Sequence, residues 1–305
     1  MATTKPIVLL YKLFSFLSVI RGYNILVLVA AQYLAAIFIF SPKKSPRAVI
    51  LDSHLFYIVL ASVFVVAAGY IINNFYDSKA DTINRPLKTG IDSYIKQSTK
   101  LSIYFFLNIV GVSIGFLVSW RVALFFSIYI FGIWFYSHKL KRFPFTGIFS
   151  ATILMMLPFF AVFIYFKNFS KIIFVHAIFL FLVIMVRELI KELENIKGAI
   201  INNYKTFPVA YGEKRTKQVS IFLLFLTVIP IVILFSYPAI SLMKYYFYFA
   251  LLILIFVGIY LWVSTKRKQY GFLHNVLKFL LVIGVLSLLF IDTSLIVEKV
   301  IDKLN

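Results

Sequence analysis

The sequence predicts an all-α membrane protein, a bundle of about nine transmembrane helices. Hydrophobic residues make up 62% of the 305 residues and charged residues only 14%, with a mean hydropathy of +0.96. Soluble domains carry about 25% charged residues. Nine apolar runs are long enough to cross a bilayer as helices. Because no polar stretch is long enough to fold alone, we expect residues 1–305 to form a single transmembrane domain.

The nine predicted spans can be placed in chain order. They cover residues 19–40, 53–76, 99–119, 121–138, 145–166, 172–190, 218–236, 243–263 and 272–291. Residues 1–18 form a lead-in, and the mixture of apolar and polar residues over 6–18 predicts an interfacial helix. The narrowest boundary is Ser119-Trp120-Arg121, where a fusion of two spans would change both the count and the topology.

Most of the 31 Lys and Arg residues lie on the side of the amino terminus. By the positive-inside rule that side is cytoplasmic, and an odd number of spans places the carboxyl terminus outside. We expect a multi-pass protein of a prokaryotic plasma membrane. The two long polar loops, residues 77–98 and 187–217, fall on the same cytoplasmic side. The net charge of +20 does not indicate nucleic-acid binding, because the basic residues flank apolar spans. The absence of cysteine excludes disulfides and thiolate metal sites.

The first polar stretch follows the second apolar run. Asn73, Asp77 and Asp81 lie at i, i+4 and i+8, so they share one face if the helix continues through them. Stacked carboxylates repel each other, and Mg²⁺ offsets this while binding the phosphate oxygens of a substrate. The stretch therefore predicts a diphosphate-binding edge. A polar helix end solvated at the membrane surface stays open as the alternative.

The second polar stretch follows the sixth span. Positions 188, 192, 195 and 199 recur with steps of four, three and four, and a helix would align them in one stripe: Glu188, Glu192, Asn195 and Ala199. The alternative is a surface helix stabilised by i, i+3 pairs such as Glu188 with Lys191.

Together these stretches resemble the UbiA superfamily of intramembrane prenyltransferases. The segment Asn73-x3-Asp77-x3-Asp81, followed by Asn84-Arg85-Pro86, is similar to the first aspartate motif of that family. Further similar pieces are Arg21-Gly22-Tyr23-Asn24, Tyr136-Ser137-x2-Leu140-Lys141-Arg142 and Lys205-Thr206-Phe207-Pro208. Within the family, Arg187 to Ala199 looks most similar to the branch that geranylgeranylates geranylgeranylglyceryl phosphate.

The resemblance implies Mg²⁺-dependent transfer of a prenyl group from a polyprenyl diphosphate to a membrane-associated acceptor, with release of pyrophosphate. It also implies a central cavity that opens to the cytoplasmic side. The implied metal ligands are Asn73, Asp77, Asp81, Glu192 and Asn195. The implied catalytic residues are Asp77, Asp81, Arg85, Lys141 and Lys205. The implied substrate-binding residues are Arg21, Asn24, Asn73, Tyr136, Ser137 and Glu188.

The chain departs from the family pattern in the second motif, which usually supplies aspartates where this sequence has Glu192, Asn195 and Ala199. Glu192 keeps the charge and Asn195 keeps an oxygen, but Ala199 offers no ligand. The resemblance favours geranylgeranyl diphosphate as donor and geranylgeranylglyceryl phosphate as acceptor. The alternatives are an aromatic acceptor of quinone biosynthesis (hydroxybenzoate or dihydroxynaphthoate), a membrane transporter, or a catalytically weakened family member.

Overall fold

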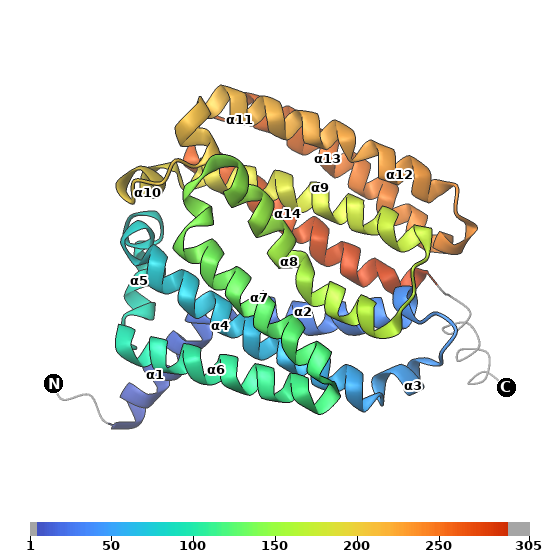
Figure 1. The fold of residues 1–305 in the computed structure, drawn as a ribbon. Coiled ribbons are helices and arrows are strands. Elements are labelled where there is room, and N and C mark those ends of the chain that lie inside the picture. The colour runs from blue at the N-terminus through green and yellow to red at the C-terminus, as the bar shows by residue number, and fades with distance from the viewer. Residues whose placement is uncertain (1–4, 292–305) are drawn as a thin grey trace. The chain divides into compact units, whose positions relative to one another are not determined.

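The computed structural model describes residues 5–291, and their side chains from Leu10 onward. All regular structure in this range is helical (Figure 1). The α-helices are α1 (Lys5–Val19), α2 (Gly22–Ala35), α3 (Pro46–Ile50), α4 (Ser53–Asn84), α5 (Pro86–Asp92), α6 (Gln97–Val118), α7 (Trp120–His138), α8 (Pro144–Phe166), α9 (Lys171–Glu194), α10 (Ile196–Ile201), α11 (Phe207–Leu226), α12 (Val228–Phe235), α13 (Lys244–Val263) and α14 (Arg267–Ser287). Short 3-10 or π-helical turns lie at η1 (Ala36–Phe40), η2 (Leu140–Arg142), η3 (Pro238–Met243) and η4 (Leu288–Phe290).

Nine helical segments of the described chain are long and apolar enough to cross a membrane, which confirms the predicted count. The narrow boundary at Ser119 is also confirmed. Ser119 is extended (φ −173°, ψ 160°), and its hydroxyl accepts from the backbone N–H of Val122 to cap α7. The turn is close enough that a Cβ on Gly115 would lie 3.1 Å from the Cα of Ala123. Spans three and four are therefore separate helices.

The described chain divides into two compact units, each built from three segments. The first unit comprises residues 1–29, 52–161 and 195–210, and the second comprises residues 30–51, 162–194 and 211–305. Each is described by itself below. The single domain and its central cavity stay predictions. The first four residues of the predicted lead-in lie outside the described residues, and so does the carboxyl terminus, which was predicted to lie outside the cell.

Helix α4 is longer than the predicted second span and passes through the whole first polar stretch. Asp52 caps its start by accepting from the backbone N–H of Leu55 at 3.1 Å. The helix ends at Asn84 because Arg85 precedes a proline, which disfavours the helical conformation for the residue before it. Arg85 is accordingly non-helical (φ −144°, ψ 61°). Asn73, Asp77 and Asp81 thus lie on one continuous helix, which is the condition under which their spacing places them on one face.

The two polar loops of the prediction are largely helical, and this corrects the assignment. Residues 77–98 contain the end of α4 and all of α5, and residues 187–217 contain the end of α9, α10 and the start of α11. Hydropathy does not reveal these helices because their residues are polar. The predicted single stripe over 188–199 is also wrong, because Asn195 (φ −107°, ψ 15°) breaks the helix between α9 and α10. A second break lies at Gly212, whose φ of 83° suits glycine.

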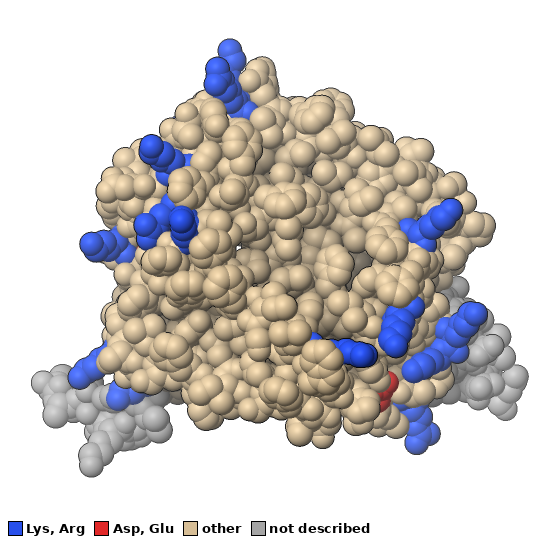
Figure 2. All heavy atoms as spheres, viewed as in Figure 1, with Lys and Arg blue, Asp and Glu red and all other residues tan. Residues whose placement is uncertain are grey.

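In the first unit, α4 packs along α6 and α7 (Figure 1). The approach of α6 to α4 is close, since a Cβ on Gly111 would lie 2.9 Å from the Val65 side chain. In the second unit, α14 packs on α9 and α13 around the fully buried Leu273 and Leu277. Figure 2 shows Lys and Arg toward the helix ends and an uncharged surface over the helix middles on the face drawn, which is the pattern of membrane-spanning helices.

Candidate functional site

The polar end of α4 meets a lysine from the turn η2. The Nζ of Lys141 donates to Oδ1 of Asp77 at 2.6 Å and to Oδ1 of Asn73 at 3.3 Å. The Lys141 side chain is 7% exposed, whereas the Asp77 side chain is 22% exposed. The structure therefore brings three predicted site residues together, and Asp77 keeps access to solvent.

Two tyrosines that the sequence reasoning did not select surround this lysine. The Nζ of Lys141 lies 5.7 Å from the ring centroid of Tyr76 and 5.6 Å from that of Tyr204. Both distances are within cation–π range. The Tyr76 hydroxyl lies 3.2 Å from Nδ1 of His138. No local pattern distinguishes Tyr76 or Tyr204 among the 19 tyrosines of the chain.

Tyr204 is also affected by the charges around it. Burial raises the pKa of its hydroxyl to about 12, and the negative charge of Asp77 acts in the same direction. The guanidinium of Arg142, which lies 5.9 Å from the Tyr204 ring centroid, acts in the opposite direction. The hydroxyl is therefore protonated at neutral pH, so Tyr204 can donate a proton in a hydrogen bond.

The segment after Asn195 is fixed against the same site within the first unit. The backbone N–H of Lys205 donates to the carbonyl of Arg142 at 2.9 Å. Asn84, at the end of α4, donates through Nδ2 to the carbonyl of Asn195 at 3.4 Å. A Cβ on Gly198 would lie 2.2 Å from that Nδ2, so only glycine allows α10 to approach Asn84 this closely. The Lys205 side chain is exposed.

Asp81 lies one helical turn after Asp77, in a mostly basic surrounding. The charged groups that act on it are Asp77, Arg85, Arg21 and Lys88. Arg21 lies over the Tyr70 ring at 5.0 Å, and the amide of Asn24 donates to the Tyr70 hydroxyl at 3.4 Å. Arg21 and Asn24, predicted as substrate-binding residues, therefore share one aromatic contact.

Two further predicted residues lie near η2 at the end of α7. Ser137 is completely buried, and its Oγ has no hydrogen-bond partner within the described chain. Tyr136 is half-buried. The predicted roles of both in substrate binding stay predictions.

The remaining acidic candidates belong to the second unit. The carboxylate of Glu188 accepts from Arg187 at 3.2 Å and from Lys191 at 2.7 Å, one cation on each oxygen, and its side chain is 5% exposed. Glu192 is half-buried on the same helix, shortly before α9 ends at Glu194. The role of Glu188 in substrate binding and that of Glu192 in metal binding stay predictions.

The donor set on α4 fits a hard divalent cation. Asp77, Asp81 and Asn73 offer oxygen atoms alone, which is the ligand type that Mg²⁺ prefers, and Mg²⁺ often takes only one or two carboxylates with water and substrate phosphate. No group of three or more His, Asp or Glu side chains gathers as a protein-only metal centre within residues 5–291. Water and substrate oxygens would complete the coordination of a cation held here.

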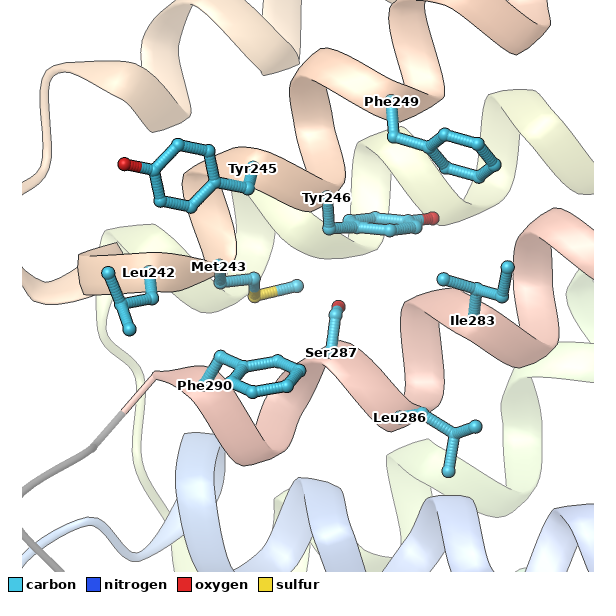
Figure 3. Close-up of a pocket in the computed structure, with 9 residues that line it drawn as sticks. All are labelled: Leu242, Met243, Tyr245, Tyr246, Phe249, Ile283, Leu286, Ser287 and Phe290. Carbon is cyan, nitrogen blue, oxygen red and sulfur yellow. The ribbon is translucent and has the colours of Figure 1, made fainter. Parts of the chain in front are cut away.

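An apolar groove of about 460 Å³ lies in the second unit, between α13, α14 and the turns beside them (Figure 3). It is lined by Leu242, Met243, Tyr245, Tyr246, Phe249, Ile283, Leu286, Ser287 and Phe290. It contains none of the predicted site residues and no charged side chain. Its chemistry suits a hydrocarbon and not a diphosphate.

The sequence matches the model of the UbiA prenyltransferase family over residues 25–282. The chain belongs to this family. It is therefore a prenyltransferase and a multi-pass integral membrane protein. Two similar proteins are the digeranylgeranylglyceryl phosphate synthases of Methanobrevibacter smithii, 29% identical over 68% of this chain and 73% of that protein, and of Methanosphaera stadtmanae, 27% identical over 76% of this chain and 86% of that protein.

Solved structures show the same fold. A UbiA homolog from Archaeoglobus fulgidus bound to GPP and Mg²⁺ superimposes with a TM-score of 0.67, covering 90% of this prenyltransferase and 99% of that chain at 14% identity. A digeranylgeranylglyceryl phosphate synthase structure gives a TM-score of 0.66 at 20% identity, covering 91% and 97%. The predicted all-α fold is confirmed.

Proposed function

We propose that this prenyltransferase transfers a geranylgeranyl group from geranylgeranyl diphosphate to geranylgeranylglyceryl phosphate, releasing pyrophosphate. The named synthases among its relatives support this acceptor, and the neighbour bound to GPP and Mg²⁺ supports a prenyl diphosphate donor. The basic loops support a site on the cytoplasmic side of a prokaryotic plasma membrane.

The observation that carries the proposal is the buried Lys141 Nζ against Asp77 and Asn73. A lysine placed this way offers a fixed positive charge beside a carboxylate that is still 22% exposed. Such a pair suits a metal-bridged diphosphate, because the cation and the metal can neutralise different phosphate oxygens.

Asn73, Asp77 and Asp81 would hold the Mg²⁺, and Glu192 with Asn195 would contribute a second, weaker set of ligands. When bound, Mg²⁺ neutralises negative charge on the diphosphate. The residues of the chain act on the same charge. As the allylic C–O bond breaks, both bonding electrons leave with the pyrophosphate, and Lys141, Lys205 and Arg85 stabilise that growing charge.

The other residues bind and exclude water. The Tyr76 and Tyr204 rings cover the Lys141 Nζ, which keeps its charge away from bulk water and so strengthens its effect on the leaving group. Arg21, Asn24, Tyr136 and Ser137 would orient the acceptor, whose phosphate needs a cation such as Arg21. Glu188, whose two oxygens hold Arg187 and Lys191, would keep these two cations in place.

The test is a turnover assay with purified protein in lipid, geranylgeranyl diphosphate and a panel of acceptors, with and without Mg²⁺. The proposal predicts that pyrophosphate release depends on Mg²⁺. It also predicts that geranylgeranylglyceryl phosphate is the only acceptor of the panel that gives a product, which is an ether lipid. Product with hydroxybenzoate or dihydroxynaphthoate would instead identify an aromatic prenyltransferase. Substrate counterflow without any product would indicate a transporter, and the absence of turnover with every pair would indicate a weakened family member.

A further inference from the structure

A buried carboxylate that the proposed reaction does not use contacts α4 next to the proposed metal ligand Asn73. Asp92, the last residue of α5, is 2% exposed. Its Oδ1 accepts from the Ser18 hydroxyl at 2.7 Å, and its Oδ2 accepts from Lys88 Nζ at 2.6 Å and from Asn74 Nδ2 at 3.1 Å. These three donors come from α1, α5 and α4.

The network extends to a fourth helix through Asn74. The Oδ1 of this amide accepts from Lys100 Nζ at 3.1 Å, so Asn74 uses both ends of its side chain. Lys100, in the first turn of α6, is 4% exposed. Buried polar networks are worth more than separate pairs only when every member is satisfied, and here both oxygens of Asp92 and both ends of Asn74 have partners.

A second contact joins the same elements from outside the network. The rings of Tyr11, in α1, and Tyr94, two residues after Asp92, stack with centroids 5.2 Å apart and planes 10° apart. Helix α1 thus contacts the end of α5 at Asp92 and the segment after it at Tyr94. A neighbouring face of α1 presents the exposed apolar residues Leu10, Leu13, Phe14 and Leu17, at the spacing of a helix that lies in a membrane interface.

The position of this network in the chain gives it a role. Asn74 is adjacent to the proposed ligand Asn73, and α5 begins directly after Arg85, which acts on Asp81. The start of α5 is tied to α4 by the chain, and its end is tied to α4 by Asp92. Without the second tie, α5 could pivot about Arg85 and move that guanidinium relative to Asp81.

We propose that Asp92 is a positioning residue, which fixes α5 and therefore Arg85 for the diphosphate by joining α1, α4 and α6. The predicted effect on the kinetics rests on the proposed function, whereas the predicted effect on the position of α5 does not. Asp92 touches no reacting atom in this scheme. Its effect on the reaction passes through Arg85 and the α4 face.

The structural consequence is measured first, on a spin label. The chain has no cysteine, so Leu87→Cys, at an α5 position that is 86% exposed, gives a single labelling site. Adding Asp92→Asn or Ser18→Ala should raise the mobility of this label, with the larger increase for Asp92→Asn because it loses the Lys88 ion pair. Asp52→Asn is the control, because it makes the same chemical change at the start of α4, far along the chain from α5. It should leave the mobility of the label unchanged.

The kinetic consequence is measured on the same substitutions without the label. Asp92→Asn should raise KM for geranylgeranyl diphosphate about tenfold and also lower kcat, because Arg85 both binds the diphosphate and stabilises the charge that grows on it in the transition state. The acceptor KM should not move. A purely structural role would lower Tm with both KM values unchanged. Unchanged label mobility and donor KM in both variants would overturn the proposal.

The two proposals fail in different ways. If the unsubstituted protein turns over no donor, the proposed function fails, and the label mobility still decides whether Asp92 fixes α5. If the unsubstituted protein is active and the variants have the same label mobility and the same donor KM, the positioning role of Asp92 is wrong while the proposed function stands.

Discussion

Asp77, which belongs to the first unit, and Glu188, which belongs to the other, have similar sequence surroundings, since each follows an apolar span and each has basic residues nearby. Their structural surroundings differ. The Asp77 side chain is 22% exposed and holds one lysine at 2.6 Å. The Glu188 side chain is 5% exposed and holds a cation on each oxygen, Arg187 and Lys191.

The difference in surroundings means that the Asp77 carboxylate can still bind a metal ion, whereas both oxygens of the Glu188 carboxylate are already occupied by cations. Asp77 retains an oxygen and access to solvent, so a metal and a phosphate can reach it. Glu188 would have to give up an ion pair in a buried place, which costs several kcal/mol per uncompensated charge. We infer that the first polar stretch carries the chemistry and that Glu188 contributes mainly to folding, and the following predictions test this difference.

The largest effect is expected at Asp77. Asp77→Ala should lower pyrophosphate release at least about 10³-fold, because it removes a metal ligand and leaves Lys141 without its carboxylate. The measurement is Mg²⁺-dependent turnover per folded enzyme, with Asp52→Ala at the start of the same helix as control. Near-normal turnover in Asp77→Ala would remove the basis of the metal assignment.

Lys141 should come next. Lys141→Met keeps the length of the side chain but removes its charge, so turnover should fall about 10²-fold through the lost stabilisation of the leaving pyrophosphate. Lys139→Met, at an exposed lysine two residues earlier, provides a matched control and should stay within about twofold of the unsubstituted enzyme. Equal losses in both variants would contradict a specific role for Lys141.

Glu188 should affect stability more than rate. Glu188→Gln leaves the half-buried Arg187 and Lys191 without their anion, which should lower the free energy of unfolding by about 3 kcal/mol. Turnover per folded molecule should stay within about threefold. Thermal unfolding in lipid or detergent and turnover on the same samples check this. A raised substrate KM at unchanged stability would instead support the sequence-based prediction that Glu188 binds substrate.

The smallest effect is expected for Tyr204→Phe. The ring, which lies over Lys141, is kept, and only a hydroxyl is lost. Because the pKa of Tyr204 is raised to about 12, the hydroxyl stays protonated below that value and cannot titrate near neutral pH. The pH–rate profiles of the two proteins between about pH 6 and 9 should therefore coincide in shape. If the pH–rate profile of the unsubstituted enzyme rose or fell with pH where that of Tyr204→Phe stayed flat, Tyr204 would titrate during the reaction.

Much of the fold could be predicted from hydropathy alone, because crossing a bilayer requires an apolar run of known length. The boundaries failed where helices continue in polar sequence. Asn73 to Asn84 reads as the end of a span and yet completes α4, and the polar start of α11, with Glu213 and Lys217, reads as a loop. Both segments carry ion pairs that hydropathy does not reveal, Lys141 with Asp77 at 2.6 Å on α4 and Lys217 with Glu213 at 2.7 Å on α11.

The candidate site was predictable in part. The spacing of Asn73, Asp77 and Asp81 defined one face, and the resemblance added Lys141. The Asp92 network was missed because its partner Ser18 is 74 residues away and has the sequence surroundings of an ordinary interfacial serine. The break at Asn195 was missed as well, since Glu188 to Ala199 has helical spacing throughout and only the packing of Gly198 on Asn84 shows where α10 turns.

Metal binding without turnover tests the central claim most directly. Mn²⁺, an EPR-visible substitute for Mg²⁺, would be titrated in the presence of pyrophosphate into the unsubstituted protein, Asp77→Ala and Glu188→Gln, each verified as folded. We predict saturable binding to the unsubstituted protein and to Glu188→Gln, and none to Asp77→Ala. Binding by Asp77→Ala equal to that of the unsubstituted protein, or its loss in folded Glu188→Gln, would contradict the account.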